Sequence, residues 1–249
     1  MKHTCSFAIK ALLLTALCAT TLTSCIMRKE DPGKEVKKTI RVTPFENIDV
    51  NGNASVYLQQ GDSFKVVMVG MENEIKRTEV SCKDGILFID EAGNGEAGGY
   101  QKMTFDYHFN HTKVYVTMPR LRKLEQMGNS DIEMQKPFTG DSILFEIQGN
   151  ASMDIASLKA DYLGIRILGN ASADLRNLTV ETMLLGIQGN ASVDADMKDA
   201  GNVSVGIEGN ASVELTGTTR VRPSIDITGN GSVSNNTTRS KAPASAKVK

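Results

Sequence analysis

A four-residue phrase returns at a fixed interval in the second half of this chain and narrows the folds open to it. Gly-Asn-Ala-Ser begins at Gly149, Gly169, Gly189 and Gly209, and a weakened copy, Gly-Asn-Gly-Ser, begins at Gly229. Each step is 20 residues long and contains no insertion. A constant period of this size is typical of stacked repeats, in which each unit packs only against its neighbours.

Apolar residues alternate with polar residues on both sides of each phrase, as in Leu163, Ile165 and Ile167. A period of two indicates strands with one face turned inward. A 20-residue step favours a solenoid over a sandwich or a propeller, whose units are longer. The predicted class is all-β: a right-handed parallel β-helix with about 20-residue coils in the C-terminal half and a more irregular β-rich N-terminal half. The expected hand follows the general preference of parallel crossovers.

Equivalent side chains of successive coils should lie above one another at about 4.8 Å. The repeated glycine would allow a backbone conformation, or a close approach, that a Cβ would block. Stacked asparagine amides would hydrogen-bond along the axis as a structural ladder, and its expected members are Asn150, Asn170, Asn190, Asn210 and Asn230.

An acidic position recurs two residues after each serine, at Asp154, Asp174, Asp194 and Glu214. Carboxylates stacked in this way repel one another. One interpretation is a cation-binding edge, because calcium takes several carboxylate oxygens. The other is a solvated face that keeps the solenoid soluble. The chain lacks the Gly-Gly-x-Gly-x-Asp pattern of calcium-binding β-rolls, which favours the solvated face.

The N-terminus reads as a secretory signal. Lys2 and Lys10 precede an apolar run, Ala11 to Leu22, that is too short to span a bilayer. The run ends Leu22-Thr23-Ser24-Cys25, which resembles the bacterial lipobox. This resemblance implies that Cys25 is lipidated, so that the membrane is a partner through the N-terminal lipid. Because Ile26 is not an aspartate, it also implies sorting to the outer membrane.

The expected organisation has four parts. Residues 1–24 are the lipoprotein signal peptide, 25–43 a polar tether, 44–234 the β-solenoid domain, and 235–249 a disordered polar tail. Short strands are expected from Pro44 onward, with a hairpin turn at Lys83-Asp84-Gly85. Without the signal, 26 basic residues stand against 29 acidic residues, a formal charge of −3, which argues against nucleic acid as a partner.

Several segments resemble one known family. Phe45 to Val50 followed by Gly52 to Asp62, then Met71-Glu72-Asn73, Lys83 to Leu87 and Val116 to Pro119, are similar to the "putative auto-transporter adhesin head domain", or GIN domain. With the Gly-Asn-Ala-Ser coils, the resemblance covers about residues 44–234. It implies a β-helical fold typical of lipoproteins and secreted proteins of Gram-negative bacteria. It assigns no catalytic residues.

The sequence contains no nucleophile elbow, zinc-protease motif or phosphate-binding loop, so we expect no catalytic site, cofactor or metal. His108 and His111 lie on opposite sides of a strand and lack a third ligand. Cys82 is expected to be a small buried apolar residue rather than a reactive thiol. Asp141-Ser142-Ile143 resembles a short bacterial O-glycosylation motif, which makes Ser142 a candidate modification site.

The leading hypothesis is a non-catalytic, lipid-anchored envelope protein, surface-exposed or periplasmic, that presents a rigid β-helical face to an unknown macromolecule, a surface protein or a glycan. The alternative is a structural or assembly role in which solenoid ends stack into oligomers. The weakened repeat at Gly229 and the polar tail predict a capped C-terminal end, which disfavours open stacking. A glycan-active enzyme is a third hypothesis, but insertion-free coils leave no room there for the long loops of a catalytic cleft.

Overall fold

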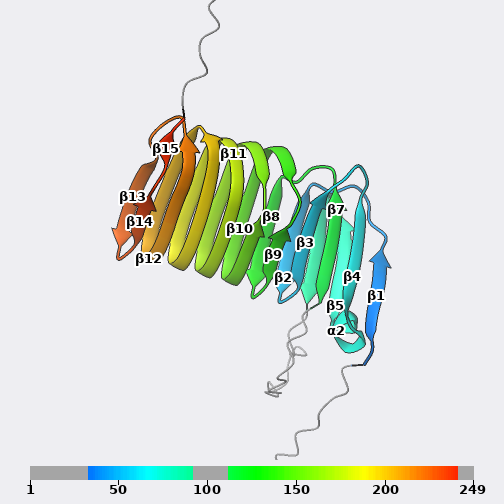
Figure 1. The fold of residues 1–249 in the computed structure, drawn as a ribbon. Helices are drawn as coiled ribbons and strands as arrows, with labels where there is room; N and C mark the ends of the chain where they lie inside the picture. The colour runs from blue at the N-terminus through cyan, green and yellow to red at the C-terminus, as the bar shows by residue number, and fades with distance from the viewer. Residues whose placement is uncertain (1–32, 92–111, 241–249) are drawn as a thin grey trace, which may run out of the picture. The chain divides into compact units, whose positions relative to one another are not determined.

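The computed structural model describes residues 33–91 and 112–240, which form a stack of β-strands accompanied by one short helix (Figure 1). The first elements in chain order are β1 (Glu35–Ile40), β2 (Asn47–Gly52), β3 (Ser55–Gln60), β4 (Lys65–Met71), α2 (Glu72–Arg77), β5 (Thr78–Lys83) and β6 (Ile86–Glu91). After residues 92–111 come β7 (Lys113–Met118), β8 (Lys123–Gly128), β9 (Asp131–Met134), β10 (Phe138–Ile155), β11 (Leu158–Ala200), β12 (Asn202–Thr219), β13 (Ser224–Gly229), β14 (Ser232–Asn235) and β15 (Thr238–Arg239).

The C-terminal half winds as a solenoid. β10, β11 and β12 are long strands that follow the coils around the stack, and each lies parallel to the next (Figure 1). Residues 20 apart are paired, as in Gly149 with Gly169 and Asn190 with Asn210. The predicted all-β solenoid of stacked parallel coils is therefore confirmed.

The inward-facing residues of each coil fill a continuous apolar core. In the coil of β10, Phe145, Ile147, Met153 and Ile155 are at most 1% exposed. Since the register is 20 residues, each packs below its counterpart in the next coil, as Phe145 does below Ile165. The alternation seen in the sequence is thus the alternation between core and solvent.

Each coil bends at its repeated glycine, which has a positive φ, +126° at Gly149 and +141° at Gly169. A Cβ added to Gly169 would overlap the carbonyl oxygen of Gly149 in the coil before it. Both reasons that the sequence offered for this glycine, an unusual backbone conformation and a close approach, therefore act at the same position.

In the N-terminal half, chain order differs from spatial order. β2 lies between β6 and β8, and β3 lies between β7 and β9, all in parallel. Gly52 therefore stacks on Gly128, a residue far away in the sequence. At the end of the stack β4 pairs antiparallel with β1 and β7. The more irregular N-terminal half is as expected.

The predicted hairpin forms between β5 and β6, which pair antiparallel. Its turn residues Asp84 and Gly85 have φ values of 51° and 76°, the left-handed pair that two-residue hairpin turns favour. The helix α2 was not predicted. It is only six residues long, with Ile75 buried and Lys76 paired to Glu72 at 2.8 Å, and so shows too few turns for a periodic signal.

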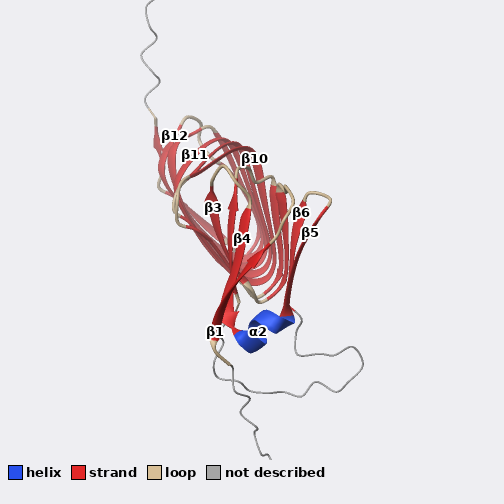
Figure 2. Ribbon diagram, turned by 90° about the vertical axis from the view of Figure 1, so that its right-hand side faces the viewer, coloured by secondary structure: helices blue, strands red, loops and turns tan. Residues whose placement is uncertain are grey.

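Two boundaries differ from the expected organisation. β1 lies inside the segment expected to be a tether, and β15 lies inside the expected tail, paired with β12. Both strands carry mostly exposed polar side chains and contribute backbone pairing rather than core, which is why composition hid them. Figure 2 shows β1 beside β4 at the end of the stack.

The last described coil leaves the C-terminal end of the core more exposed than the cap predicted from the sequence would. Every residue of β13 is exposed, and within the described residues β13, β14 and β15 pair only with β12. Ile225 and Ile227, each 38% exposed, continue core rows that no further described coil covers. No helix in the described parts of the chain is long and apolar enough to cross a bilayer.

Candidate functional site

The asparagines of the repeated phrase form a row of hydrogen-bonded amides along the solenoid. In each pair Nδ2 donates to the Oδ1 of the preceding coil: Asn129 to Asn53 at 3.1 Å, Asn150 to Asn129 at 2.7 Å, Asn170 to Asn150 at 2.9 Å, Asn190 to Asn170 at 2.9 Å and Asn210 to Asn190 at 3.1 Å. Asn230 stands one coil further, where its backbone N–H donates to the Gly209 carbonyl at 3.0 Å. Each amide in the ladder interior keeps one donor and one acceptor site free.

A parallel row of serines lies two residues further along each coil. Because alternate residues of a strand point to the same face, Asn and Ser share the outer side, about 7 Å apart. The serine side chains are exposed, and the row consists of Ser152, Ser172, Ser192 and Ser212. These serines stack in register from coil to coil, as Ser152 does with Ser172 and Ser192 with Ser212.

The two rows border a shallow groove of about 920 Å³ whose lining comes from Asn129–Asp131, Asn150–Ser152 and the equivalent triplets of later coils as far as Ser232. Its lining residues are Asn, Ala and Ser except for Asp131 at one end. Ser130 replaces the alanine of the later coils; it is 5% exposed, and its Oγ has no hydrogen-bond partner. The groove is thus lined by small, nearly all uncharged residues whose amides and hydroxyls repeat once per coil.

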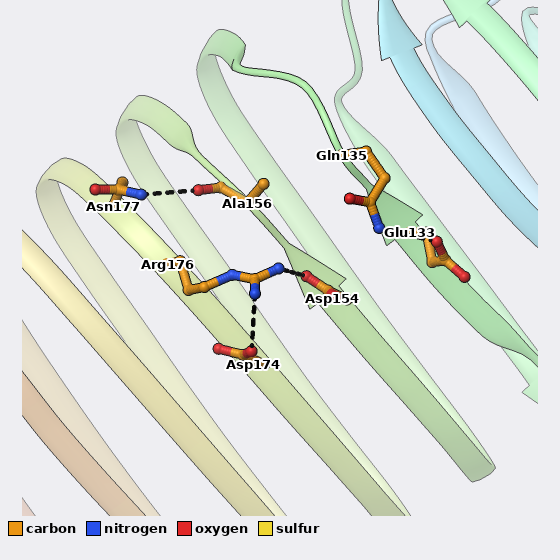
Figure 3. A network of polar contacts seen from close by, with 7 residues as sticks. All are labelled: Glu133, Gln135, Asp154, Ala156, Asp174, Arg176 and Asn177. Carbon is orange, nitrogen blue, oxygen red and sulfur yellow. Dashed lines mark hydrogen bonds and ion pairs between the residues drawn. The ribbon is translucent and has the colours of Figure 1, made fainter.

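The acidic row flanks the groove on the side of the serines. Arg176 lies between the first two carboxylates, where it contacts Asp154 and is 3.4 Å from Asp174 (Figure 3). Further along, Asn236 Nδ2 donates to Glu214 Oε1 at 3.1 Å. A cation from the chain itself therefore reduces the repulsion that stacked carboxylates would otherwise have.

Among residues 33–91 and 112–240, no three His, Cys, Asp or Glu side chains are placed to hold one metal ion. The acidic row has one carboxylate per coil, and Arg176 already occupies the space between Asp154 and Asp174 (Figure 3). Of the two interpretations of this row, the arrangement fits a solvated face more closely than a calcium edge, which needs several oxygens around one point.

Two tyrosines stand at the head of the acidic row. Tyr115 and Tyr57 are paired across β7 and β3, and Tyr57 is paired with Glu133, whose next neighbour is Asp154. The tyrosine rings stack with centroids 4.7 Å apart, and Tyr115 is 41% exposed. Burial, followed by the charge and hydrogen bond of Glu133, raises the pKa of Tyr57 to about 12, so its hydroxyl stays protonated at neutral pH.

A second charged cluster lies on the outer face of β2, β8 and β10. Lys123 Nζ is 2.8 Å from Glu125 and 2.6 Å from Glu146. Asp49 lies beside Glu125 in register, and its Oδ1 is buried without a hydrogen-bond partner. Burial first, and then the charges of Glu125 and Asp90, raise the pKa of Asp49, while Lys123 lowers it.

The remaining sequence candidates are scattered. Ser142 is exposed in β10 and stacks on Tyr162, away from the groove. Cys82 is half-buried, with its thiol 3.4 Å from the Thr43 carbonyl oxygen. Cys25, together with His108 and His111, lies outside the described residues. Sequence reasoning did not identify the serine row as functional, although its period was visible, and the tyrosine pair left no local signal because its members come from different strands.

The chain matches one family model, described as "Putative auto-transporter adhesin, head GIN domain", over residues 44–237. The chain belongs to this family. The match begins just before β2 and ends after β14, so the GIN domain contains the whole groove. A search of curated proteins found no match.

Solved structures share the GIN fold at low identity. A protein titled a putative adhesin from Bacteroides fragilis is 19% identical with a TM-score of 0.54, over 81% of this chain and 97% of its own. A protein titled a putative lipid binding protein from Parabacteroides distasonis is 13% identical with a TM-score of 0.56, over 84% and 96%. At these identities the likeness extends to the fold alone. The family description associates the GIN domain with adhesin-like proteins of the cell envelope.

Proposed function

We propose that this GIN-domain protein is a non-catalytic, lipid-anchored protein of the bacterial outer membrane that binds another macromolecule through the regular surface of its solenoid. The observation that carries the proposal is the alignment of identical polar groups in rows along the coils. Such rows offer the same contact many times to an extended partner, so that weak contacts add up.

The absence of a catalytic role is supported by the chemistry of the rows. The groove is lined by amides, hydroxyls and one carboxylate, Asp131, in a shallow and open arrangement. Catalysis in a glycan-active enzyme uses a pair of carboxyl groups across an enclosed substrate, one of them a proton donor with a raised pKa. Asp49, a carboxyl whose pKa is raised, lies on the face of β2 and β8 rather than in the groove.

The lipid anchor is tested by labelling cells with a palmitate analogue. Wild-type protein should incorporate the label, and Cys25→Ala should lose it. Cys82→Ala is the matched control, since it removes the other cysteine outside the predicted signal peptide and should label normally. Label retained by Cys25→Ala would contradict the anchor.

Binding and location are tested together on intact cells. Added protease should remove a surface-exposed protein and spare a periplasmic one. Purified full-length protein should then bind at least one target on arrays of cell-surface proteins, matrix proteins and glycans. A protein that binds none of them would contradict the adhesin-like role.

One observation favours the alternative of a structural role. Every residue of β13 is exposed, and Ile225 and Ile227, each 38% exposed, lie at an open end of the core. Unpaired strand edges with apolar neighbours are the usual sites of edge-to-edge association. Light scattering across a concentration series distinguishes the two roles, because end-to-end assembly should grow with concentration and be blocked by Ile225→Lys.

A further inference from the structure

We propose that the groove between the asparagine and serine rows is a binding site for an uncharged, extended polysaccharide. This inference rests on the proposed function and specifies the class of ligand. It uses the groove rather than the whole solenoid surface, and so it can fail while the broader binding role stands.

The groups that line the groove match the hydrogen-bonding needs of sugar hydroxyls. Each interior asparagine has one free N–H and one free lone pair after the ladder is formed, and each serine contributes a hydroxyl that both donates and accepts. Sugar hydroxyls also donate and accept, so they can pair with either row. The ladder fixes the amides in advance, which lowers the entropy lost on binding.

The geometry selects an extended ligand. The groove crosses successive coils, with one Asn and one Ser in each, so its contacts repeat at about 4.8 Å. The advance per residue of an extended β-linked polysaccharide is close to this interval. A chain laid along the groove would therefore meet an equivalent pair of polar groups at successive sugars, whereas a compact ligand would use only one or two coils.

The charges around the groove disfavour polyanions. Asp131 lies within the lining, and the row from Asp154 to Glu214 flanks it, so that nucleic acids and acidic polysaccharides would be repelled. A folded protein partner would need large apolar or aromatic anchors in fitted pockets. The lining residues contain no apolar side chain larger than alanine. An uncharged polymer rich in hydroxyls fits the lining, and a polycation attracted by the acidic row is the competing outcome of the test below.

An exposed aromatic ring lies at the same end of the solenoid. Tyr115, 41% exposed, stands two strands beyond Glu133 in line with the acidic row, where an aromatic ring can contact a sugar. The buried Ser130 takes the inward-facing position that alanine has in the later coils, so its hydroxyl is not part of this contact surface.

The test is affinity electrophoresis of the full-length chain in native gels that contain glucomannan, arabinoxylan or the β-1,3-glucan laminarin. Polygalacturonate serves as a polyanion and poly-lysine as a polycation in parallel binding assays. We expect at least one neutral polysaccharide to retard the protein. Retardation by none of the three would overturn the inference, as would binding of poly-lysine alone.

A matched pair of double variants locates the site. Ser192→Val with Ser212→Val removes two hydroxyls of the groove in adjacent coils, and Ser204→Val with Ser224→Val removes two paired hydroxyls of another strand face. Valine suits an exposed strand, so both variants should melt like wild type. The groove variant should bind about tenfold more weakly, from the loss of about two hydrogen bonds, while the control should be unchanged.

Equal binding by the two variants would overturn the groove as the site. Should the valine variant fail to fold, Ser192→Ala with Ser212→Ala removes the same hydroxyls with a smaller change. If the protein binds protein targets on surface arrays and the groove variant binds them equally, the polysaccharide inference fails and the proposed function stands. If neither polysaccharides nor surface targets are bound, both fail.

Discussion

Two glycines of the same coil should respond in opposite ways to alanine. Gly189 is a bend glycine with φ +133°, and a Cβ added there would overlap the carbonyl oxygen of Gly169. Gly186, three residues earlier, faces outward and would place an added Cβ in open space. Gly189→Ala and Gly186→Ala therefore differ only in the position of one methyl group.

The cost of Gly189→Ala has two parts. The positive φ costs a residue with a Cβ about 1–3 kcal/mol. The overlap with Gly169 pushes two coils apart and weakens neighbouring ladder hydrogen bonds, each of net value about 1 kcal/mol. Together the loss should reach about 3 kcal/mol. Gly186→Ala loses no contact and restricts the unfolded chain, so it should be neutral or stabilise by up to about 1 kcal/mol.

The assay is urea and thermal unfolding followed by circular dichroism. For a chain of this size, 1 kcal/mol shifts Tm by about 2–4 °C, so Gly189→Ala should melt roughly 6–12 °C lower. Gly186→Ala should melt at or above the wild-type temperature. Since Gly189 lies in a central coil with neighbours on both sides, its effect cannot be local fraying. Equal melting of the two variants would refute the reasoning about the bend.

Four further outcomes follow from the structure. Asn190→Ala removes two ladder hydrogen bonds and should lower the free energy of unfolding by about 1–2 kcal/mol in urea titrations, and no change would show that water replaces them fully. Gln126→Met should raise it by about 1–3 kcal/mol, because the Gln126 amide is fully buried with neither polar atom paired; a loss would contradict this. The folded state raises the pKa of Asp49 above its ordinary 3.8, so this carboxyl stabilises the fold at low pH and the benefit is lost as pH rises through the folded-state pKa. Asp49→Asn should therefore stabilise at pH 7 by urea unfolding, with a gain that vanishes below about pH 4, and a pH-independent gain would count against the raised pKa. Because Arg176 is paired with Asp154, millimolar calcium should leave Tm unchanged, and an upward shift would revive the cation edge.

The coils of the second half were predictable because one residue type marks each turn. Glycine is required wherever the backbone needs a positive φ and a neighbouring coil leaves no space for a Cβ, so it recurs at every bend, as at Gly149 and Gly169. The strands between bends alternate in polarity because one face is buried. Period and polarity together determine both the coil length and the direction of each side chain.

The N-terminal half was less predictable because its neighbours in space are distant in sequence. Asn129 bonds to Asn53 although β3 to β8 and the helix α2 lie between them in the sequence, and no fixed period connects the two coils. The edge strand β1 is polar, and its contribution is backbone pairing, which leaves no hydrophobic pattern. Elements that stabilise by backbone pairing alone are the ones that composition does not reveal.

Only part of the candidate site could be predicted from the sequence. Positions of the asparagine, serine and acidic residues follow from the repeat, but the groove between the rows depends on how the coil bends at its glycine. The contact of Arg176 with Asp154 depends on a side chain reaching across to the preceding coil. The unpaired Ser130 becomes notable only once its burial is known, since serine in that position otherwise resembles a conservative change from alanine.

The 20-residue step is kept without deviation in the part of each coil that carries the Asn and Ser rows. A solenoid is stable when each coil fits its neighbours, and a loop inserted at a corner would satisfy that condition. The one register shift between β11 and β12 lies between Met197 and Ala200, and by Ser204 the 20-residue pairing has resumed. The irregularity is therefore confined to a corner away from the groove, while the Asn and Ser rows stay aligned through every coil from Gly149 to Gly209. Packing already favours this place, because a shift of one residue within the rows would turn the polar side chains inward and the core side chains outward. A ligand that spans many coils would depend on the same alignment.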